Sequence, residues 1–190
     1  MQEPKLGQLV EAILFTQSKS LTLPEIAKVL KTDDRSLIKE EINKLNQVYE
    51  DTGRTFFIQN VAGGYLLTTR SEYQPWIVAS KTVKAVTLSP SVMETLSIVA
   101  YKQPVTRADV EEVRSVDASY AVRSLLDKGL IRIQGRKEVP GRPLLYGTSK
   151  QFLEVFGFKT LGELPRPEEF DLIESTTQTE QISIEGHIEE

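Results

Sequence analysis

The stretch GRKEVPGRPLLYG, residues 135–147, decides how the rest of the chain is interpreted. It follows the apolar-alternating run 130–133 and contains three glycines, two prolines and three basic residues. Proline fixes φ and lacks an N–H group, whereas glycine adopts turn conformations closed to other residues. The pattern therefore predicts a β-hairpin with a long, stiff and basic tip.

Three helices are predicted near the start of the chain. Apolar residues recur at helical spacing over residues 5–16 and predict the first helix. Thr22 and Glu25 have the spacing of a capping box at the start of the second helix, which should end near residue 30. The third helix is expected over residues 33–53, from an aspartate cap to a glycine stop. Strand-like runs at residues 56–58 and 65–68 then predict a short hairpin.

The same order recurs at an offset of 84 residues. A helix from Leu88 to Gln103 precedes a second capping box, in which Thr106 and Asp109 take the places of Thr22 and Glu25. A third helix, from about residue 117 to the glycine stop at 129, leads into the long hairpin. A capping box and a following helix and hairpin at one offset indicate a duplicated unit. Since three helices and a hairpin "wing" define the winged helix, we expect an α+β chain of two tandem winged-helix domains.

The domain boundaries follow from this repeat. The first winged-helix domain is expected over residues 1–79 and the second over residues 88–165, with residues 80–87 as a linker. One further helix, over residues 151–164, should pack on the second domain. Residues 166–190 hold eight acidic residues and one basic residue without a core pattern, so we expect a disordered acidic tail.

Composition argues against catalysis. The chain has no cysteine, and its one histidine, His187, lies in the acidic tail. Nucleophilic schemes that need a Ser–His or Cys–His pair are therefore unsupported, and no phosphate-binding glycine loop follows a strand. We predict that the protein is not an enzyme and has neither a cofactor nor a metal site. Without a membrane-length apolar run or any cysteine, a cytoplasmic location is expected.

DNA binding is the main alternative, because helix-turn-helix folds place the third helix in the major groove. Residues 33–51, however, carry six acidic and three basic residues, and residues 117–128 carry two of each. Neutralising phosphates supplies much of the affinity for DNA, and these helices offer little of it. A winged-helix transcription regulator stays open as an alternative, as does a generic protein-interaction adaptor.

Two residue sets are candidates for protein contacts. The second wing combines a proline-stiffened tip, basic residues and an apolar return strand, so binding there would lose little conformational entropy. Its candidate partner-binding residues are Arg136, Lys137, Pro140, Arg142, Leu145 and Tyr146. The first domain is rich in aromatic residues, and its candidate dimerisation residues are Phe56, Phe57, Tyr65 and Trp76.

The second half of the chain resembles the bacterial segregation and condensation protein B family, ScpB. The resemblance is carried by YKQPVTRADVEEVRSV (101–116), SLLDKGLI (124–131), GRKEVPGRPLLYGTS (135–149) and FLEVFGFKTLGELP (152–165). The layout of the first half and the acidic tail also fit. One departure is Ser115, where the family often has glycine before the third helix.

This resemblance implies a function that spacing alone does not reach. ScpB-like proteins are paired winged-helix proteins that dimerise chiefly through the N-terminal domain and bind the central part of the kleisin ScpA. Through ScpA they join the SMC ATPase in a condensin-like complex for chromosome condensation and segregation. The ATP chemistry would belong to SMC, in agreement with the missing phosphate-binding loop here. Any DNA contact of this chain would then be weak and indirect.

Overall fold

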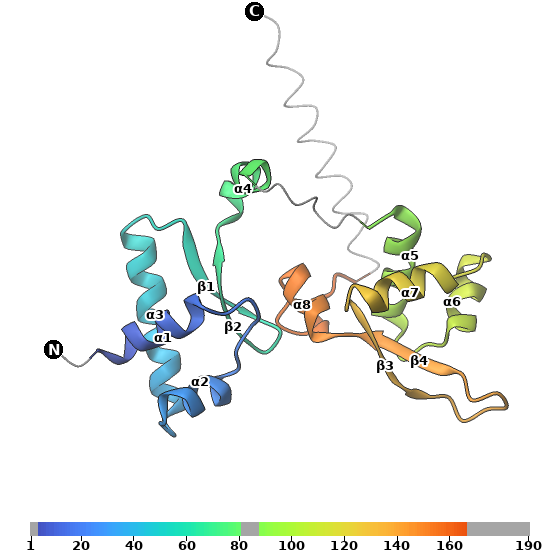
Figure 1. The fold of residues 1–190 in the computed structure, drawn as a ribbon, viewed down its shortest axis with the longest axis horizontal. Helices are drawn as coiled ribbons and strands as arrows, with labels where there is room; N and C mark the ends of the chain where they lie inside the picture. Colours follow the sequence, from blue (N-terminus) through green and yellow to red (C-terminus); the bar gives the residue numbers. More distant parts are fainter. Residues whose placement is uncertain (1–3, 81–87, 167–190) are drawn as a thin grey trace, which may run out of the picture. The chain divides into compact units, whose positions relative to one another are not determined.

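The computed structural model describes residues 4–80 and 88–166. Residues up to Thr160 belong to one compact unit, and those from Leu161 to another. The expected linker 80–87 is described only at Ser80, and residues 167–190 of the tail lie outside the described residues. Within the described ranges the chain is a mixed α/β fold of helices and two separate two-stranded sheets (Figure 1).

Two stretches of the chain have the same element order, three helices followed by two antiparallel strands. The first, here called repeat one, consists of α1 (Leu6–Phe15), α2 (Leu23–Leu30), α3 (Arg35–Asp51), β1 (Phe56–Val61) and β2 (Gly64–Thr69). The second, repeat two, consists of α5 (Pro90–Lys102), α6 (Arg107–Arg114), α7 (Ser119–Asp127), β3 (Ile131–Arg136) and β4 (Leu144–Thr148). A 3-10 turn η1 (Ser71–Tyr73) and α4 (Gln74–Ser80) follow repeat one.

Both expected capping boxes are present. The Glu25 carboxylate accepts hydrogen bonds from the Thr22 backbone N–H at 2.7 Å and from its hydroxyl at 2.7 Å. In the second box the Asp109 carboxylate accepts from the Thr106 N–H at 2.8 Å, and the Thr106 hydroxyl accepts from the Asp109 N–H at 3.2 Å. These bonds satisfy donors that a helix start leaves free, so they fix where α2 and α6 begin.

The two capped helices also end alike. Lys31 after α2 and Ser115 after α6 both adopt left-handed backbone conformations, with φ of 54° and 56°. The two positions are 84 residues apart, the offset of the capping boxes. Left-handed backbone is strained for a residue with a Cβ, which explains why glycine suits the place of Ser115 better.

Each hairpin is tied to its own repeat by one backbone bridge. In repeat one the Leu21 and Tyr65 N–H groups donate to each other's carbonyl oxygens at 2.9 and 2.7 Å. In repeat two, Val105 and Tyr146 exchange the same pair of bonds at 3.1 and 2.7 Å. Because Val105 follows Leu21 by 84 residues, the duplication includes the point at which the hairpin is anchored.

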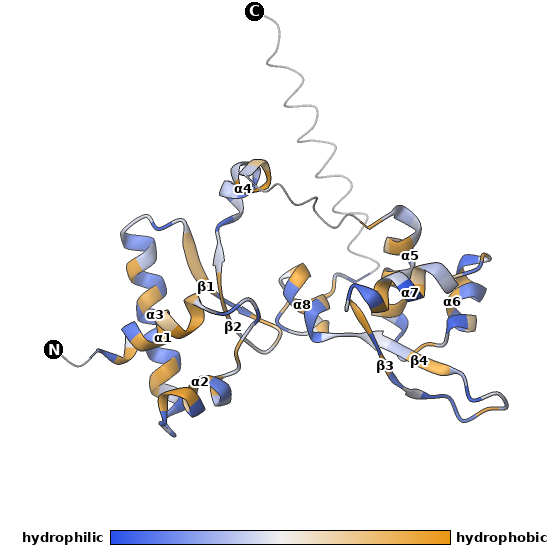
Figure 2. Cartoon of the chain, viewed as in Figure 1, coloured by the Kyte–Doolittle hydropathy of each residue, from blue (hydrophilic) through white to orange (hydrophobic). Residues whose placement is uncertain are grey.

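Each repeat has a separate core. In repeat one, buried side chains of all three helices and the hairpin meet, and Figure 2 shows apolar and polar residues alternating around α3. The members are Val10, Leu14, Ile26, Ala27, Ile38, Ile42, Tyr49, Ile58 and Tyr65. In repeat two the buried apolar residues include Val92, Leu96, Val99, Val110, Val122, Leu125, Ile131 and Tyr146. Period-3.6 patterns on the helices produce these buried faces.

The last helix is shorter than the sequence suggests. The apolar residues of 151–164 predict one helix, but α8 spans only Lys150–Phe156. Gly157 ends it with φ of 74°, and Leu161–Glu163 form the 3-10 turn η2. Phe152 is buried, whereas Val155 is 61% exposed. Most of the aromatic and aliphatic residues expected to pack there therefore remain at least partly open to solvent.

Candidate protein-interaction surfaces

The tip between β3 and β4, residues 137–143, has a defined backbone rather than an open loop. The Lys137 N–H donates to the Pro143 carbonyl at 2.9 Å, and two further backbone bonds within the tip involve Val139. Gly141 and Arg142 both have positive φ. A bulge between Ile133 and Gly135 shifts the register below the tip. Proline and these bonds hold one shape in the absence of a partner, so binding need not order the tip first.

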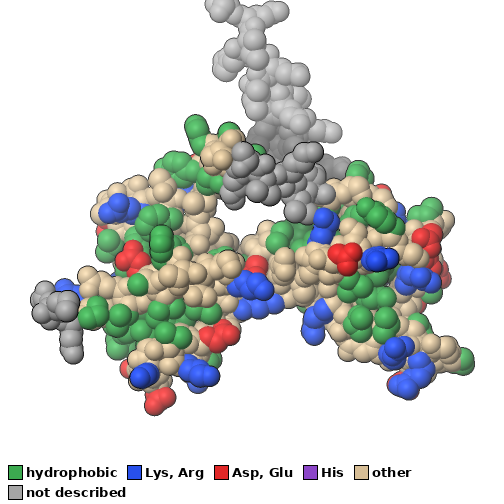
Figure 3. Space-filling view, viewed as in Figure 1, with side chains coloured by type: hydrophobic (Ala, Val, Ile, Leu, Met, Phe, Trp, Pro, Cys, Tyr) green, Lys and Arg blue, Asp and Glu red, His purple; other side chains and the backbone are tan. Residues whose placement is uncertain are grey.

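The basic side chains of the tip all have partners within the chain. Lys137 Nζ lies 3.3 Å from Asp109 Oδ1, and Arg142 Nη2 lies 3.2 Å from Glu138 Oε1. Arg136 Nη1 donates to the Arg142 carbonyl at 3.1 Å. These three side chains remain exposed, and Figure 3 shows basic side chains grouped at the end of this hairpin. The tip is therefore a positioned, partly neutralised basic surface, which offers less to a phosphate backbone than the sequence count implies.

Asp109 joins the start of α6 to the hairpin. Its pKa is lowered, first by the hydrogen bond from the Thr106 N–H, with further contributions from the Thr106 side chain and from Lys137. The carboxylate is thus held in its charged form, which both the helix cap and the Lys137 ion pair require. One side chain consequently couples the helix start to the direction of the hairpin.

The apolar candidates of this hairpin lie beneath the basic ones. Tyr146 is only 8% exposed and forms the bridge to Val105. Leu145 is half-buried on the same strand, whereas Pro140 is exposed at the tip. A partner can therefore reach the tip residues directly, while Tyr146 supports the hairpin from inside repeat two.

The aromatic candidates of repeat one also divide between core and surface. Tyr65 is buried, and Phe56 packs edge-on against Tyr49 with ring centroids 5.0 Å apart. Phe57 is half-buried under Arg70, whose guanidinium carbon lies 5.8 Å from the ring centroid. Trp76, on α4, is 70% exposed. Of the four candidates, Trp76 is the most accessible, and Phe56 and Phe57 are both half-buried.

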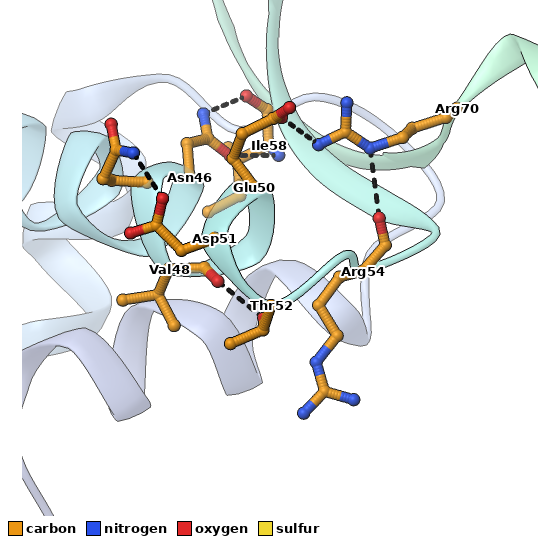
Figure 4. Close-up of polar contacts among 9 residues, drawn as sticks. Asn46, Val48, Glu50, Asp51, Thr52, Arg54, Ile58 and Arg70 are labelled. Carbon is orange, nitrogen blue, oxygen red and sulfur yellow. Dashed lines mark hydrogen bonds and ion pairs between the residues drawn. The ribbon is translucent and has the colours of Figure 1, made fainter.

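Arg70 fixes the end of the first hairpin against the end of α3. Its Nη2 forms an ion pair with Glu50, and its Nε donates to the Arg54 carbonyl at 3.1 Å (Figure 4). On the same helix, Asn46 exchanges hydrogen bonds with the backbone of Ile58. Three contacts on one guanidinium leave it little freedom, so Arg70 and the Phe57 ring beneath it form a preformed surface.

A groove of about 700 Å³ lies beside this surface, within repeat one and the segment that follows it. Phe57, Gln59 and Thr68 come from the hairpin, and Arg70 and Glu72 stand between the hairpin and α4. Ile77 and Val78 of α4 line it as well. The lining combines one aromatic ring and two aliphatic side chains with polar and charged residues, so the groove is suited to an amphipathic aromatic side chain of another protein.

A second groove, which the sequence did not suggest, lies between repeat two and α8. It has a volume of about 730 Å³, and its apolar residues are Leu88, Met93, Leu130, Val155 and Phe156. Asp127 and Lys128, at the end of α7, lie beside them. The residue in the sequence that could have indicated this groove is Gly157. A helix that stops there leaves Val155 and Phe156 without a following turn to cover them.

The described part of the chain shows no arrangement for metal binding or for crossing a membrane. No three His, Cys, Asp or Glu side chains gather within residues 4–80 and 88–166. No helix in those ranges is both long enough and apolar enough to span a bilayer.

Comparison with known proteins defines the family. The model of "Segregation and condensation complex subunit ScpB" matches residues 8–167. A segregation and condensation protein B of Syntrophotalea carbinolica is 41% identical over 182 residues, which cover 96% of this chain and 91% of that protein. The protein of that name from Symbiobacterium thermophilum is 43% identical over 168 residues, covering 87% of this chain and 75% of the relative.

Solved structures are also similar in sequence. A conserved hypothetical protein from Chlorobium tepidum is 36% identical, with 80% of this chain and 94% of that chain covered and a TM-score of 0.39. A dimer of the ScpB N-terminal domain complexed with a ScpA peptide is 30% identical over 38% of this chain and 90% of that chain, with a TM-score of 0.36.

A scaffold of helices and hairpins that matches this model over residues 8–167 falls in a class of complex subunits. The chain belongs to the ScpB family of segregation and condensation complex subunits. ScpB is not a known enzyme family.

Proposed function

We propose that this protein is the dimeric, non-catalytic ScpB subunit of a bacterial SMC–ScpA–ScpB complex that condenses and segregates the chromosome. The family match over residues 8–167 carries the proposal, because it spans nearly every described residue. The relative solved with a ScpA peptide is an N-terminal ScpB dimer, which supports a homodimer and a ScpA partner for this chain. SMC is reached through ScpA, and the site of action is the cytoplasm, at the nucleoid.

Within that role we assign both repeats to winged-helix domains. Residues 1–79 form the dimerising domain and residues 88–165 the kleisin-binding domain, while nearly all of the expected linker and acidic tail lies outside the described residues. The repeated order of three helices and a hairpin, with equivalent caps and hairpin anchors, supports two domains of one kind.

The β3–β4 tip is the ScpA-contacting surface in this proposal. Its backbone is preformed, Pro140 is exposed, and Arg136, Lys137 and Arg142 are held by contacts that a kleisin carboxylate or carbonyl can share. The internal ion pairs neutralise much of the charge that DNA would need. A protein partner therefore fits the tip better than a nucleic acid.

The test reverses two charges at the tip. Replacing Arg136 and Arg142 together by Glu should weaken binding of the purified chain to ScpA by about tenfold or more, because like charges then face the kleisin. Both side chains are exposed, so folding and the mass of the dimer in light scattering should not change. Arg123→Glu on α7 is the matched control, since it reverses an exposed charge of the same domain away from the tip.

Two results would contradict the assignment. Unchanged ScpA affinity in the double variant would remove the tip from the kleisin contact. Tight duplex-DNA binding by the isolated chain, falling steeply with salt and lost in Arg123→Glu, would instead favour a DNA-binding regulator.

A further inference from the structure

Helix α4, with the sequence QPWIVAS, is an apolar helix that the described chain leaves uncovered. None of its residues is buried, and Trp76 and Val78 are 70% and 56% exposed. Its main packing partner is the adjoining 3-10 turn η1 rather than the core of repeat one. It includes no charged residue. Exposed apolar surface of this kind marks a contact with another molecule.

The groove that α4 borders is ready to receive such a contact. Phe57 and Arg70 both line it; the Phe57 ring is held under Arg70, and Arg70 is itself fixed by Glu50 and the Arg54 carbonyl. A preformed wall loses little side-chain entropy on binding. At about 700 Å³ the groove lies within the roughly 300–1,000 Å³ range of sites that enclose a small molecule, so it is large enough for an indole ring.

We propose that two copies of this chain exchange their α4 helices. In this contact, Trp76 of each copy enters the groove beside Phe57 of the other copy. This inference rests on the homodimer proposed above and locates its contact.

The arrangement of helix and groove explains why the occupant is a second copy. Ile77 and Val78 line the groove, and Trp76 lies next to them on the same helix. A two-fold axis beside α4 therefore brings the two helices together and each Trp76 to the opposite groove, so that one surface patch supplies both halves of the contact. If a kleisin segment occupied the groove, Trp76 would not need to lie beside the groove-lining residues Ile77 and Val78.

The charges agree with self-association. Because α4 is uncharged, two copies can pack against each other without like-charge repulsion. The groove is lined by one base and one acid, Arg70 and Glu72, so two identical grooves across a two-fold axis offer opposite charges to one another.

Trp76 is the only tryptophan of the chain, so its fluorescence reports on this contact alone. The experiment follows the emission maximum and acrylamide quenching of the full chain over a dilution series, with mass measured by light scattering. We expect the emission to move to shorter wavelength, and quenching to fall, at the same concentration at which the mass doubles.

The possible results separate this inference from the homodimer itself. A dimer whose Trp76 stays fully quenchable would overturn the exchange while leaving the dimer intact. Protection of Trp76 only after the central segment of ScpA is added would assign the groove to the kleisin and also overturn it. A chain that stays monomeric at every concentration would remove the homodimer and the exchange together.

Variants provide a second measurement. Trp76→Asp should weaken dimerisation at least on the order of 30-fold, the effect of losing one interface hot spot. Trp76→Phe should retain most of the affinity because it keeps an aromatic ring. Tyr120→Asp is the control, since Tyr120 is 76% exposed on α7 of repeat two. An unchanged dimer constant for Trp76→Asp, with native circular dichroism, would contradict the exchange.

Discussion

The β1–β2 and β3–β4 hairpins follow equivalent sets of helices and are anchored at equivalent bridges, but they extend differently beyond the anchor. The first pairs without a break from Phe56↔Thr69 to Val61↔Gly64 and turns through two residues, Ala62 and Gly63, both with positive φ. The second carries a bulge and the seven-residue tip 137–143. The duplicated scaffold thus keeps the anchor constant while the length beyond it varies.

What the two hairpins present differs accordingly. The short hairpin contributes Ile58 and Tyr65 to a core, and its partly open ring, Phe57, faces a groove. The long hairpin keeps Tyr146 buried at its base and holds three basic side chains at its tip. One hairpin therefore presents an apolar ring and the other a basic tip, and this difference would suit the two separate contacts proposed above, with a second copy and with ScpA.

The largest difference in stability between matched variants of the two hairpins is expected when a glycine is replaced by alanine. A Cβ at Gly64 would lie 2.6 Å from the Leu21 carbonyl oxygen and 2.7 Å from its carbon, and both are backbone atoms of the anchoring bridge. Gly64→Ala should therefore cost about 2–3 kcal/mol of unfolding free energy, as overpacking does. Thermal or urea unfolding of the full chain measures this cost.

Gly135→Ala is the matched substitution in the second hairpin. No atom lies within 4 Å of a Cβ built there, and its φ is not positive. This variant should unfold within about 0.5 kcal/mol of the parent, as surface substitutions usually do. Equal losses at Gly64 and Gly135 would show that the two hairpins are not anchored as described.

A smaller effect is expected at the capping boxes. Thr106 is 2% exposed, and its hydroxyl accepts a bond from the Asp109 N–H. Thr106→Ala should cost about 1 kcal/mol, the usual loss on removing a helix N-cap. Thr106→Ser keeps the hydroxyl and should recover most of that stability. In repeat one, Thr22→Ala should cost no more, because the hydrogen bonds of Thr22 run to the exposed Glu25 carboxylate; a larger loss there would reverse the ranking.

The last expected effect on stability is a gain rather than a loss. Ser115→Gly removes left-handed strain of about 1–2 kcal/mol but adds the chain entropy of glycine, so a net gain of roughly 0.5–1 kcal/mol is expected. Lys31→Gly should change stability in the same direction because its φ is 54°. Glu112→Gly, inside α6, should instead cost about 1 kcal/mol and controls for glycine itself. Denaturation midpoints compare all three, and destabilisation by Ser115→Gly would contradict the strain.

Local signals in the sequence predicted much of this fold. Each capping box, at Thr22 and at Thr106, lies within four consecutive residues and fixes where a helix starts. The end of α3 likewise needs only the glycine that follows it, Gly53, which has a positive φ. The repeat made these short signals stronger, because each occurred twice at one offset. Gly157 was an equally local signal for the end of α8, but the apolar residues after it suggested a longer helix.

The interaction surfaces were less predictable because distant residues decide them. Tyr65 and Trp76 are both aromatic and only eleven positions apart, yet one is buried and the other exposed. Tyr65 is buried in a core formed with residues of all three preceding helices, and its strand is bridged to Leu21, which no periodicity near Tyr65 encodes. Likewise, the partner of Lys137 is Asp109, 28 positions earlier in the chain. Whether a side chain is free to bind follows from such long-range pairing.

The separate cores have a consequence for synthesis on the ribosome. The last buried member of the first core is Tyr65, whereas the buried residues of repeat two include Tyr146, which is 81 residues later. At about 5–20 residues per second, this interval lasts roughly 4–16 s. The first repeat can therefore fold on the nascent chain while the second is still being translated. If the chain forms the homodimer proposed above, two ribosomes on one messenger would bring such folded first repeats close together, and the subunits could pair before either chain is released.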